Sequence, residues 1–211
     1  MDYKLKPPSA LDYFTALVQS DDEFPLLETA ISLAQDEFPA LDIQQVLSDV
    51  DNWAARLKRC ILPGADALDK LRELNHFFYS NLRFAGNLNH YDNPHNSYLN
   101  VVMSTRLGIP ISLAVLWLEL GQSIGLPVFG VGFPGHFLVK LDLPAPQDGH
   151  VVIDPFSGES LSREDLCERL MPWLPGVKLG HSHAVSDDAL AFHLQAAEPR
   201  EIIARMLRNL H

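Results

Sequence analysis

The longest apolar stretch of the chain covers residues 109–120 and is interrupted only by Ser112 and Glu119. A Gly-Ile-Pro sequence leads into it, and proline suits the first turn of a helix because its missing N–H loses no partner there. The stretch is shorter than the roughly 18 apolar residues that a membrane-spanning helix requires. We therefore predict a buried helix over residues 110–124, which ends before Gly125.

Apolar residues recur with helical spacing on both sides of this segment, at residues 9–19, 23–38, 42–61, 66–84, 97–106, 162–171, 186–195 and 199–211. Short runs rich in Val, Phe and Leu, bounded by Gly and Pro, predict strands at residues 127–133, 136–143 and 150–154. The order is helices, then strands, then helices, which is typical of an α+β fold. We expect a helical N-terminal region (1–90), a core with a small antiparallel sheet (91–180) and C-terminal helices (181–211), within one compact unit.

The charge and cysteine content narrow the expected partners and compartment. The 211 residues carry a formal net charge of -11, which argues against nucleic acid or an anionic membrane as the main partner. The two cysteines, Cys60 and Cys167, show neither a disulfide framework nor metal-ligand spacing, and the N-terminus shows no signal peptide. We expect a cytoplasmic protein whose partner is another protein, with no cofactor.

Three polar residues in apolar surroundings form a candidate catalytic set. Ser112 lies near the start of the predicted buried helix, His136 opens a predicted strand, and Asp154 ends the next strand. The start of one strand and the end of its antiparallel neighbour lie close together. A histidine oriented by a carboxylate is the supporting half of a nucleophilic triad, and a helix N-terminus favours an anionic nucleophile.

The motifs "NSYLN", "RLGIPISLA", "GLPVFGVGFPGHFLV" and "DPFSG", which lie within residues 91–158, resemble the SirB-type family of the transglutaminase-like superfamily. Members of that family typically carry tetratricopeptide-type repeats after the domain. The resemblance implies a papain-like core with a Cys-His-Asp site, in which the cysteine stands in a Gly-x-Cys-x-x-x-Ala motif. Gly108 and Ala114 match that motif, and His136 and Asp154 match the other two positions, but Pro110 stands where the cysteine belongs.

A proline carries no nucleophile, so we expect a catalytically inactive protein that acts as a regulatory or protein-binding module. One alternative is a Ser-dependent hydrolase or acyltransferase that uses Ser112 with His136 and Asp154. Ser112 lies about 200° around the helix from Pro110 and would need a shift of register. Another alternative is a small-molecule site in the remnant cleft.

The remaining candidates are interpreted as structural. Cys60 falls at a helix C-terminus, where the helix dipole opposes a thiolate, and we expect both cysteines to be structural on burial statistics. The histidines in "HSH" (His181 and His183), with His193 nearby, lack other ligands at metal spacing, so no metal site is expected. The segment "NHYDNPHNSY" predicts an ordered loop near the mouth of the site, with Asn96 capping the next helix.

Overall fold

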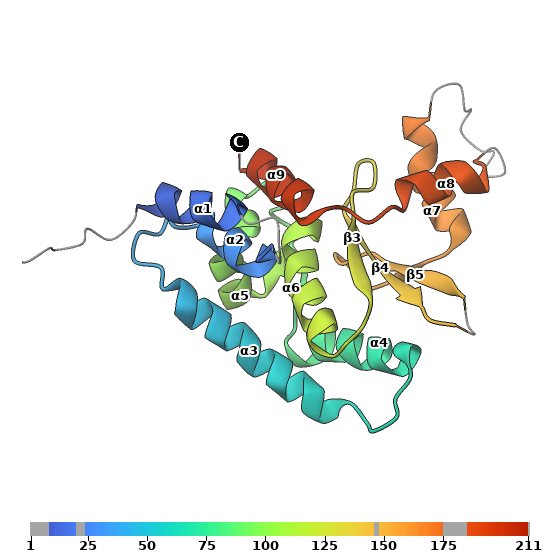
Figure 1. The fold of residues 1–211 in the computed structure, drawn as a ribbon. Coiled ribbons are helices and arrows are strands. Elements are labelled where there is room, and N and C mark those ends of the chain that lie inside the picture. Colours follow the sequence, from blue (N-terminus) through green and yellow to red (C-terminus); the bar gives the residue numbers. More distant parts are fainter. Residues whose placement is uncertain (1–8, 20–23, 146–147, 175–184, 211) are drawn as a thin grey trace, which may run out of the picture.

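The computed structural model describes residues 9–19, 24–145, 148–174 and 185–210 (Figure 1). Helices make up the first part of the chain, and their ends follow local capping chemistry. The long helix α3, for example, begins after Asp42, whose side chain accepts a hydrogen bond from the N–H of Gln45. The elements up to residue 108 are α1 (Ala10–Gln19), α2 (Leu26–Ser32), α3 (Ile43–Cys60), α4 (Ala67–Asn75), a π-helical turn (His76–Asn81), β1 (Ala85–Gly86), a 3-10 turn (Pro94–Ser97), α5 (Leu99–Thr105) and β2 (Leu107–Gly108).

The second half of the chain contains the sheet and the helices that cover it. Both Ser162 and Ser186 cap a helix by accepting a hydrogen bond from a backbone N–H three residues on. The elements are α6 (Pro110–Ser123), β3 (Val128–Val131), β4 (Leu138–Leu143), β5 (Gly149–Ile153), β6 (Ser160–Leu161), α7 (Arg163–Leu170), a 3-10 turn (Met171–Trp173), α8 (Asp187–His193) and α9 (Pro199–Asn209).

Helix α6 lies at the centre of the molecule, and the prediction that it is buried is confirmed. Its residues from Pro110 to Leu118 are all buried, which a helix achieves only when other elements cover every side of it. Helices α2, α3 and α4 and strands β3 and β4 all pack against it. In Figure 1, α6 accordingly lies between the N-terminal helices and the sheet.

The sheet has the antiparallel order β3-β4-β5-β6 and carries helices on both faces. Side chains alternate between the faces along each strand. On β4, Val139 points into the core around α6, whereas Leu138 joins a second core formed with α7 and α8. Val139 lies opposite Ile153 in the register, and this pairing brings the start of β4 next to the end of β5.

The C-terminal helix α9 returns to the N-terminal part of the fold. Its residues Ile202, Ile203 and Met206 are buried in the same core as α2, α3 and α6. Figure 1 shows α9 beside α1 and α2 and close to one end of α6. The same core therefore includes residues from all three regions expected from the sequence, 1–90, 91–180 and 181–211.

The α+β class is confirmed, and several details differ from the prediction. The predicted helix over residues 23–38 is reduced to α2 and following turns, and the one over 66–84 divides into α4 and a π-helical turn. The parallel pair β1–β2 and strand β6 were missed because each strand has two residues, too few for a periodic pattern. No helix within the described ranges is long and apolar enough to span a membrane.

Candidate functional site

The structure brings His136 and Asp154 together. His136 Nε2 lies 2.9 Å from Asp154 Oδ1, at hydrogen-bonding distance. The prediction that His136 opens a strand is wrong, because it lies in a turn that precedes β4, with its backbone N–H bonded to the carbonyl of Phe133. Gly135 makes this turn possible, because its φ of +69° is a conformation that other residues rarely adopt. Asp154 directly follows β5.

Asp154 is the centre of a larger hydrogen-bond network. Its Oδ2 accepts a hydrogen bond from Arg169 on α7 (2.8 Å), and its Oδ1 also accepts one from the backbone N–H of Phe156 (2.9 Å). Burial of the carboxyl raises its pKa, but the hydrogen bonds from His136 and Arg169 outweigh that effect and bring the pKa to about 2. Asp154 is therefore ionised at neutral pH and holds His136 and Arg169 on opposite oxygens.

Tyr79 supports the turn that follows Asp154. Its hydroxyl donates a hydrogen bond to the carbonyl of Pro155 (3.0 Å). Its ring packs against Gly158, where a Cβ atom would lie 2.7 Å from the ring. Burial, together with the negative charge of Asp154, raises the pKa of Tyr79, so this group stays a neutral phenol. The tyrosine thus holds the aspartate turn in place.

Arg205, on α9, supports the turn that carries His136. Its Nη2 donates to the backbone carbonyl of His136 (2.7 Å), and its Nη1 lies 3.5 Å from the carbonyl of Phe133. Its guanidinium also lies over the ring of Phe137. Sequence reasoning missed Arg205, Arg169 and Tyr79, because each reaches the site from a helical segment distant in sequence and no local pattern distinguishes it from other surface residues.

Pro110 and His136 line the same small cavity, which has a volume of about 160 Å³. The position that corresponds to the nucleophile in the predicted motif therefore faces the histidine across a real cavity. The other lining residues come from the loop before α5, the start of α6, the histidine turn and α9: Tyr91, Ile109, Ile111, Gly135, Phe137, Arg205 and Asn209. None of these described residues is a cysteine, serine, threonine or lysine.

Ser112 does not belong to this cavity. Its side chain is fully buried, and its hydroxyl lies 2.6 Å from the carbonyl of Asn96, to which it donates a hydrogen bond. The same oxygen accepts a hydrogen bond from the backbone N–H of Ile109 (3.1 Å). The hydroxyl is thus committed to tying the loop before α5 to the start of α6, and no hydrogen bond joins it to His136 among the described residues.

The loop before α5 is ordered by Asn96, but not in the predicted way. Asn96 does not cap the next helix. Its buried side-chain amide instead donates to the carbonyls of His90 and Tyr91, at 2.6 and 3.0 Å. Asn93 caps the 3-10 turn by accepting a hydrogen bond from the N–H of His95. The internal bonds of the loop place Tyr91 at the cavity.

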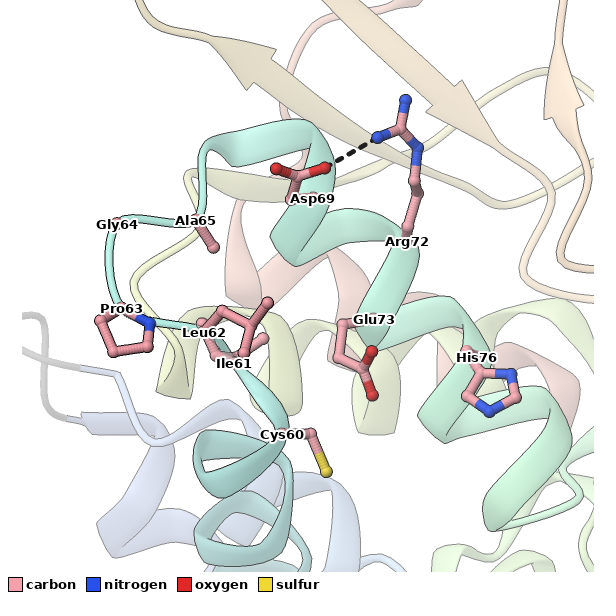
Figure 2. A pocket seen from close by; sticks show the side chains of 10 residues that line it. All are labelled: Cys60, Ile61, Leu62, Pro63, Gly64, Ala65, Asp69, Arg72, Glu73 and His76. Atoms are coloured by element: carbon pink, nitrogen blue, oxygen red, sulfur yellow. Dashed lines mark hydrogen bonds and ion pairs between the residues drawn. The ribbon is translucent and has the colours of Figure 1, made fainter.

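A second, larger cavity of about 560 Å³ lies where α3 leads into α4 (Figure 2). Figure 2 shows that Cys60, Glu73 and His76 line it, together with the connecting loop. All its lining residues lie between positions 60 and 76, so His136 and Asp154 do not contribute to it. Cys60 is exposed, so the prediction that burial explains this cysteine is wrong, whereas Cys167 is buried in the core beneath α7.

Metal ligation finds no support among the residues that the structure describes, where no three His, Cys, Asp or Glu side chains are arranged to hold an ion. His181 and His183 lie outside the described residues. His193 ends α8, where its ring contacts that of Phe192.

Comparison with known proteins places the chain among transglutaminase-like sequences. The model described as "Transglutaminase-like superfamily" matches residues 44–208. A UPF0162 protein of Xylella fastidiosa is 40% identical over 203 residues, which make up 95% of this chain and 69% of that protein. A UPF0162 protein of Pseudomonas aeruginosa is 30% identical over 185 residues, or 88% of this chain and 63% of that protein.

A shorter similarity extends to animal proteins. F-box only protein 21 of Homo sapiens is 40% identical over 70 residues, which make up 33% of this chain and 11% of that protein. No solved structure matches the chain.

Proposed function

The chain belongs to the transglutaminase-like superfamily, and from this premise we propose that it is a catalytically inactive member that acts as a regulatory or protein-binding module. One observation carries the proposal. Pro110 lines the cavity next to His136, at the position where the superfamily motif has its cysteine. The histidine and its aspartate are retained, but no thiol or serine hydroxyl among the described residues faces them.

The contacts of Ser112 weigh against the alternative of a Ser-dependent hydrolase or acyltransferase. A nucleophilic hydroxyl needs a base within hydrogen-bonding distance and a free approach for the substrate. Ser112 is fully buried and bonds to Asn96 and Ile109 instead. Removing it from these partners would leave a buried carbonyl and a buried N–H without hydrogen bonds, which costs about 1–3 kcal/mol for each group.

The relatives support a role within larger proteins. The chain spans about two thirds of the UPF0162 proteins it matches, and its similarity to F-box only protein 21 covers a small segment of a much longer chain. We assign the chain to the SirB-type branch of the superfamily. The tetratricopeptide-type repeats of that branch would then occupy the part of the relatives that this chain does not match.

The proposal is tested with reagents that modify active-site nucleophiles. The purified chain is treated with a fluorophosphonate, which labels activated serines, and with iodoacetamide, which labels thiols, and the labelled residue is identified by mass spectrometry. We expect no fluorophosphonate labelling, and iodoacetamide labelling only at the exposed Cys60, at equal rates in wild type and His136→Ala. An assay for transfer of a fluorescent amine to a glutamine-containing protein should also give no product.

Labelling of a residue in the 160 Å³ cavity, or of Ser112, that disappears in His136→Ala would overturn the proposal. Amine transfer that depends on His136 would do the same. The Cys60→Ser variant is the matched control, because it removes the exposed thiol without touching the cavity.

A further inference from the structure

Arg205 is a half-buried cation that has no carboxylate partner in the described part of the chain. Its hydrogen bonds go to the backbone carbonyls of His136 and Phe133, and its guanidinium lies over the ring of Phe137. An arginine side chain has five N–H donors and keeps its charge at every physiological pH. Since two of these donors are used, the group retains hydrogen-bonding capacity and an uncompensated positive charge.

The cavity that Arg205 lines has an unusual charge for this protein. The chain carries 27 acidic residues against 16 Lys and Arg, yet within the part of the chain that the structure describes neither Asp nor Glu lines the cavity. Its polar side chains are those of Tyr91, His136, Arg205 and Asn209. Tyr91, Arg205 and Asn209 can donate a hydrogen bond to an oxygen atom in the cavity, whereas His136 directs its Nε2 to Asp154. The volume of about 160 Å³ has room for about five water molecules, or for a small polar group in their place.

We propose that this cavity binds the carboxylate group of a ligand, with Arg205 as its counter-ion. The planar guanidinium matches a carboxylate in shape, and the pair forms two parallel, charge-assisted hydrogen bonds. A carboxylate carries one negative charge, which balances the one positive charge of Arg205, the single permanent cation among the described residues that line the cavity. A phosphate group carries up to two charges and would leave part of its charge unpaired. This inference rests on the proposed function, since a cysteine at position 110 would take up part of the same space.

The surroundings of the cavity fit a ligand larger than the carboxylate itself. A hollow of about 200 Å³ adjoins it, sharing Tyr91, Ile109 and Asn209, and a hollow of about 350 Å³ shares Phe137 and Arg205. The two hollows extend from the cavity toward the loop before α5 and along α9. A carboxylate at the end of a polypeptide, or on a small organic acid, can therefore reach Arg205 while the rest of the ligand lies in one of them.

The test is a titration followed by NMR, with the backbone amides of Gly135 and Phe137 as reporters on either side of His136. The probes are acetate, succinate, a tripeptide with a free C-terminus, the same tripeptide with an amidated C-terminus, and inorganic phosphate. We expect saturable shifts of both amides with carboxylate probes, and at least tenfold weaker binding in Arg205→Gln. Saturation by the free tripeptide but not its amide identifies a polypeptide end as the source, and saturation by succinate alone identifies a small acid.

Two further variants keep the test decisive if Arg205→Gln loosens the turn. Pro110→Asp places a carboxylate in the cavity, in the first turn of α6 where acidic residues are favourable, and should abolish binding while the protein stays folded. Pro110→Ala should bind like wild type. Arg59→Gln is the matched control, because it removes one positive charge from an exposed position of α3 that lines neither the cavity nor the two hollows.

The absence of saturable shifts with every carboxylate probe would overturn the inference, as would tighter binding of phosphate or equal binding by Arg205→Gln and Arg59→Gln. The labelling experiment has a separate readout from this titration. Failure of the inference can therefore be told apart from failure of the proposed inactivity.

Discussion

His136 Nε2 lies 2.9 Å from Asp154 Oδ1, and the other oxygen of Asp154 accepts a hydrogen bond from Arg169. His136, Asp154 and Arg169 thus form one hydrogen-bonded network. Asp154 also accepts the N–H of Phe156, so its side chain satisfies three donors at once. This difference in the number of partners makes the contributions of the two residues to stability unequal.

We expect Asp154→Ala to lower the free energy of unfolding by about 3 kcal/mol and His136→Ala by about 1 kcal/mol. The alanine at position 154 leaves Arg169 and a backbone N–H without their partner, whereas loss of His136 removes one of three hydrogen bonds to the carboxylate. Urea unfolding measures both values. Unchanged stability in both variants would contradict a structural role for the pair.

The stability supplied by Asp154 should depend on pH in the acidic range. The pKa of Asp154 is about 2 in the folded protein, below the ordinary value of 3.8. A lowered pKa means that the contribution is fully present above about pH 4 and is lost as the pH falls toward 2. The shift corresponds to about 2 kcal/mol at about 1.4 kcal/mol for each pH unit. Urea titrations at several pH values measure the free energy of unfolding of wild type and of Asp154→Asn. The difference between the two proteins should shrink by about 2 kcal/mol as the pH falls from about 4 to about 2. A constant difference would contradict the assignment.

Restoring a thiol at position 110 should reveal how much of the active-site geometry remains. In Pro110→Cys the new thiol stands at a helix N-terminus in a cavity shared with His136, and both features lower the pKa of a thiol. We expect it to react with iodoacetamide at least tenfold faster than Cys60 at neutral pH. Cys60 is an internal reference, since it is an exposed thiol at the end of α3 and does not line this cavity. If the thiols at positions 110 and 60 react at equal rates, the geometry is lost. The same conclusion follows if adding His136→Ala to Pro110→Cys does not slow the reaction of the new thiol.

Ser112→Ala should destabilise the protein without any change in probe labelling. The buried hydroxyl joins the carbonyl of Asn96 to the N–H of Ile109, and its removal leaves both groups unpaired at a cost of about 2 kcal/mol. Ser123→Ala is a suitable control, because its hydroxyl bonds, among the described residues, only to the carbonyl of Leu120 in the same helix. Thermal or urea unfolding should show a clearly smaller loss for the control. Equal losses would argue that Ser112 does not hold the loop.

Gly135→Ala should be destabilising for two separable reasons. The glycine has a φ of +69°, and a Cβ atom there would lie 2.6 Å from the ring of Trp173. In wild type we expect a loss of about 2–3 kcal/mol, of which about 1 kcal/mol is backbone strain. Trp173→Ala removes the steric conflict but not the strain, so Gly135→Ala should cost about 1 kcal/mol in that background. Additive effects in the double-mutant cycle would contradict the proposed clash.

The parts of the fold that the sequence predicted depend on short-range chemistry. The buried helix α6 follows from an apolar stretch that leaves no side of the helix polar. The starts of α7 and α8 follow from the serines that cap them. The prediction that Pro110 stands in place of a nucleophile also rests on a local motif, and it stays a prediction. Periodicity, capping and motif spacing all involve residues within a few turns of one another, so they can be read from the chain directly.

Only the tertiary structure decided which side chains support the site and which do not. Arg169 lies 15 residues from Asp154, and Arg205 lies 69 residues from His136, so their contacts depend on how α7 and α9 pack. The same holds for Ser112, whose position on α6 was predicted but whose hydroxyl bonds to Asn96, 16 residues earlier in the chain. A helix can present a given side chain to several neighbours. Which of them it meets is set by the burial of apolar surface across the whole molecule, a sum over distant contacts that no local pattern contains.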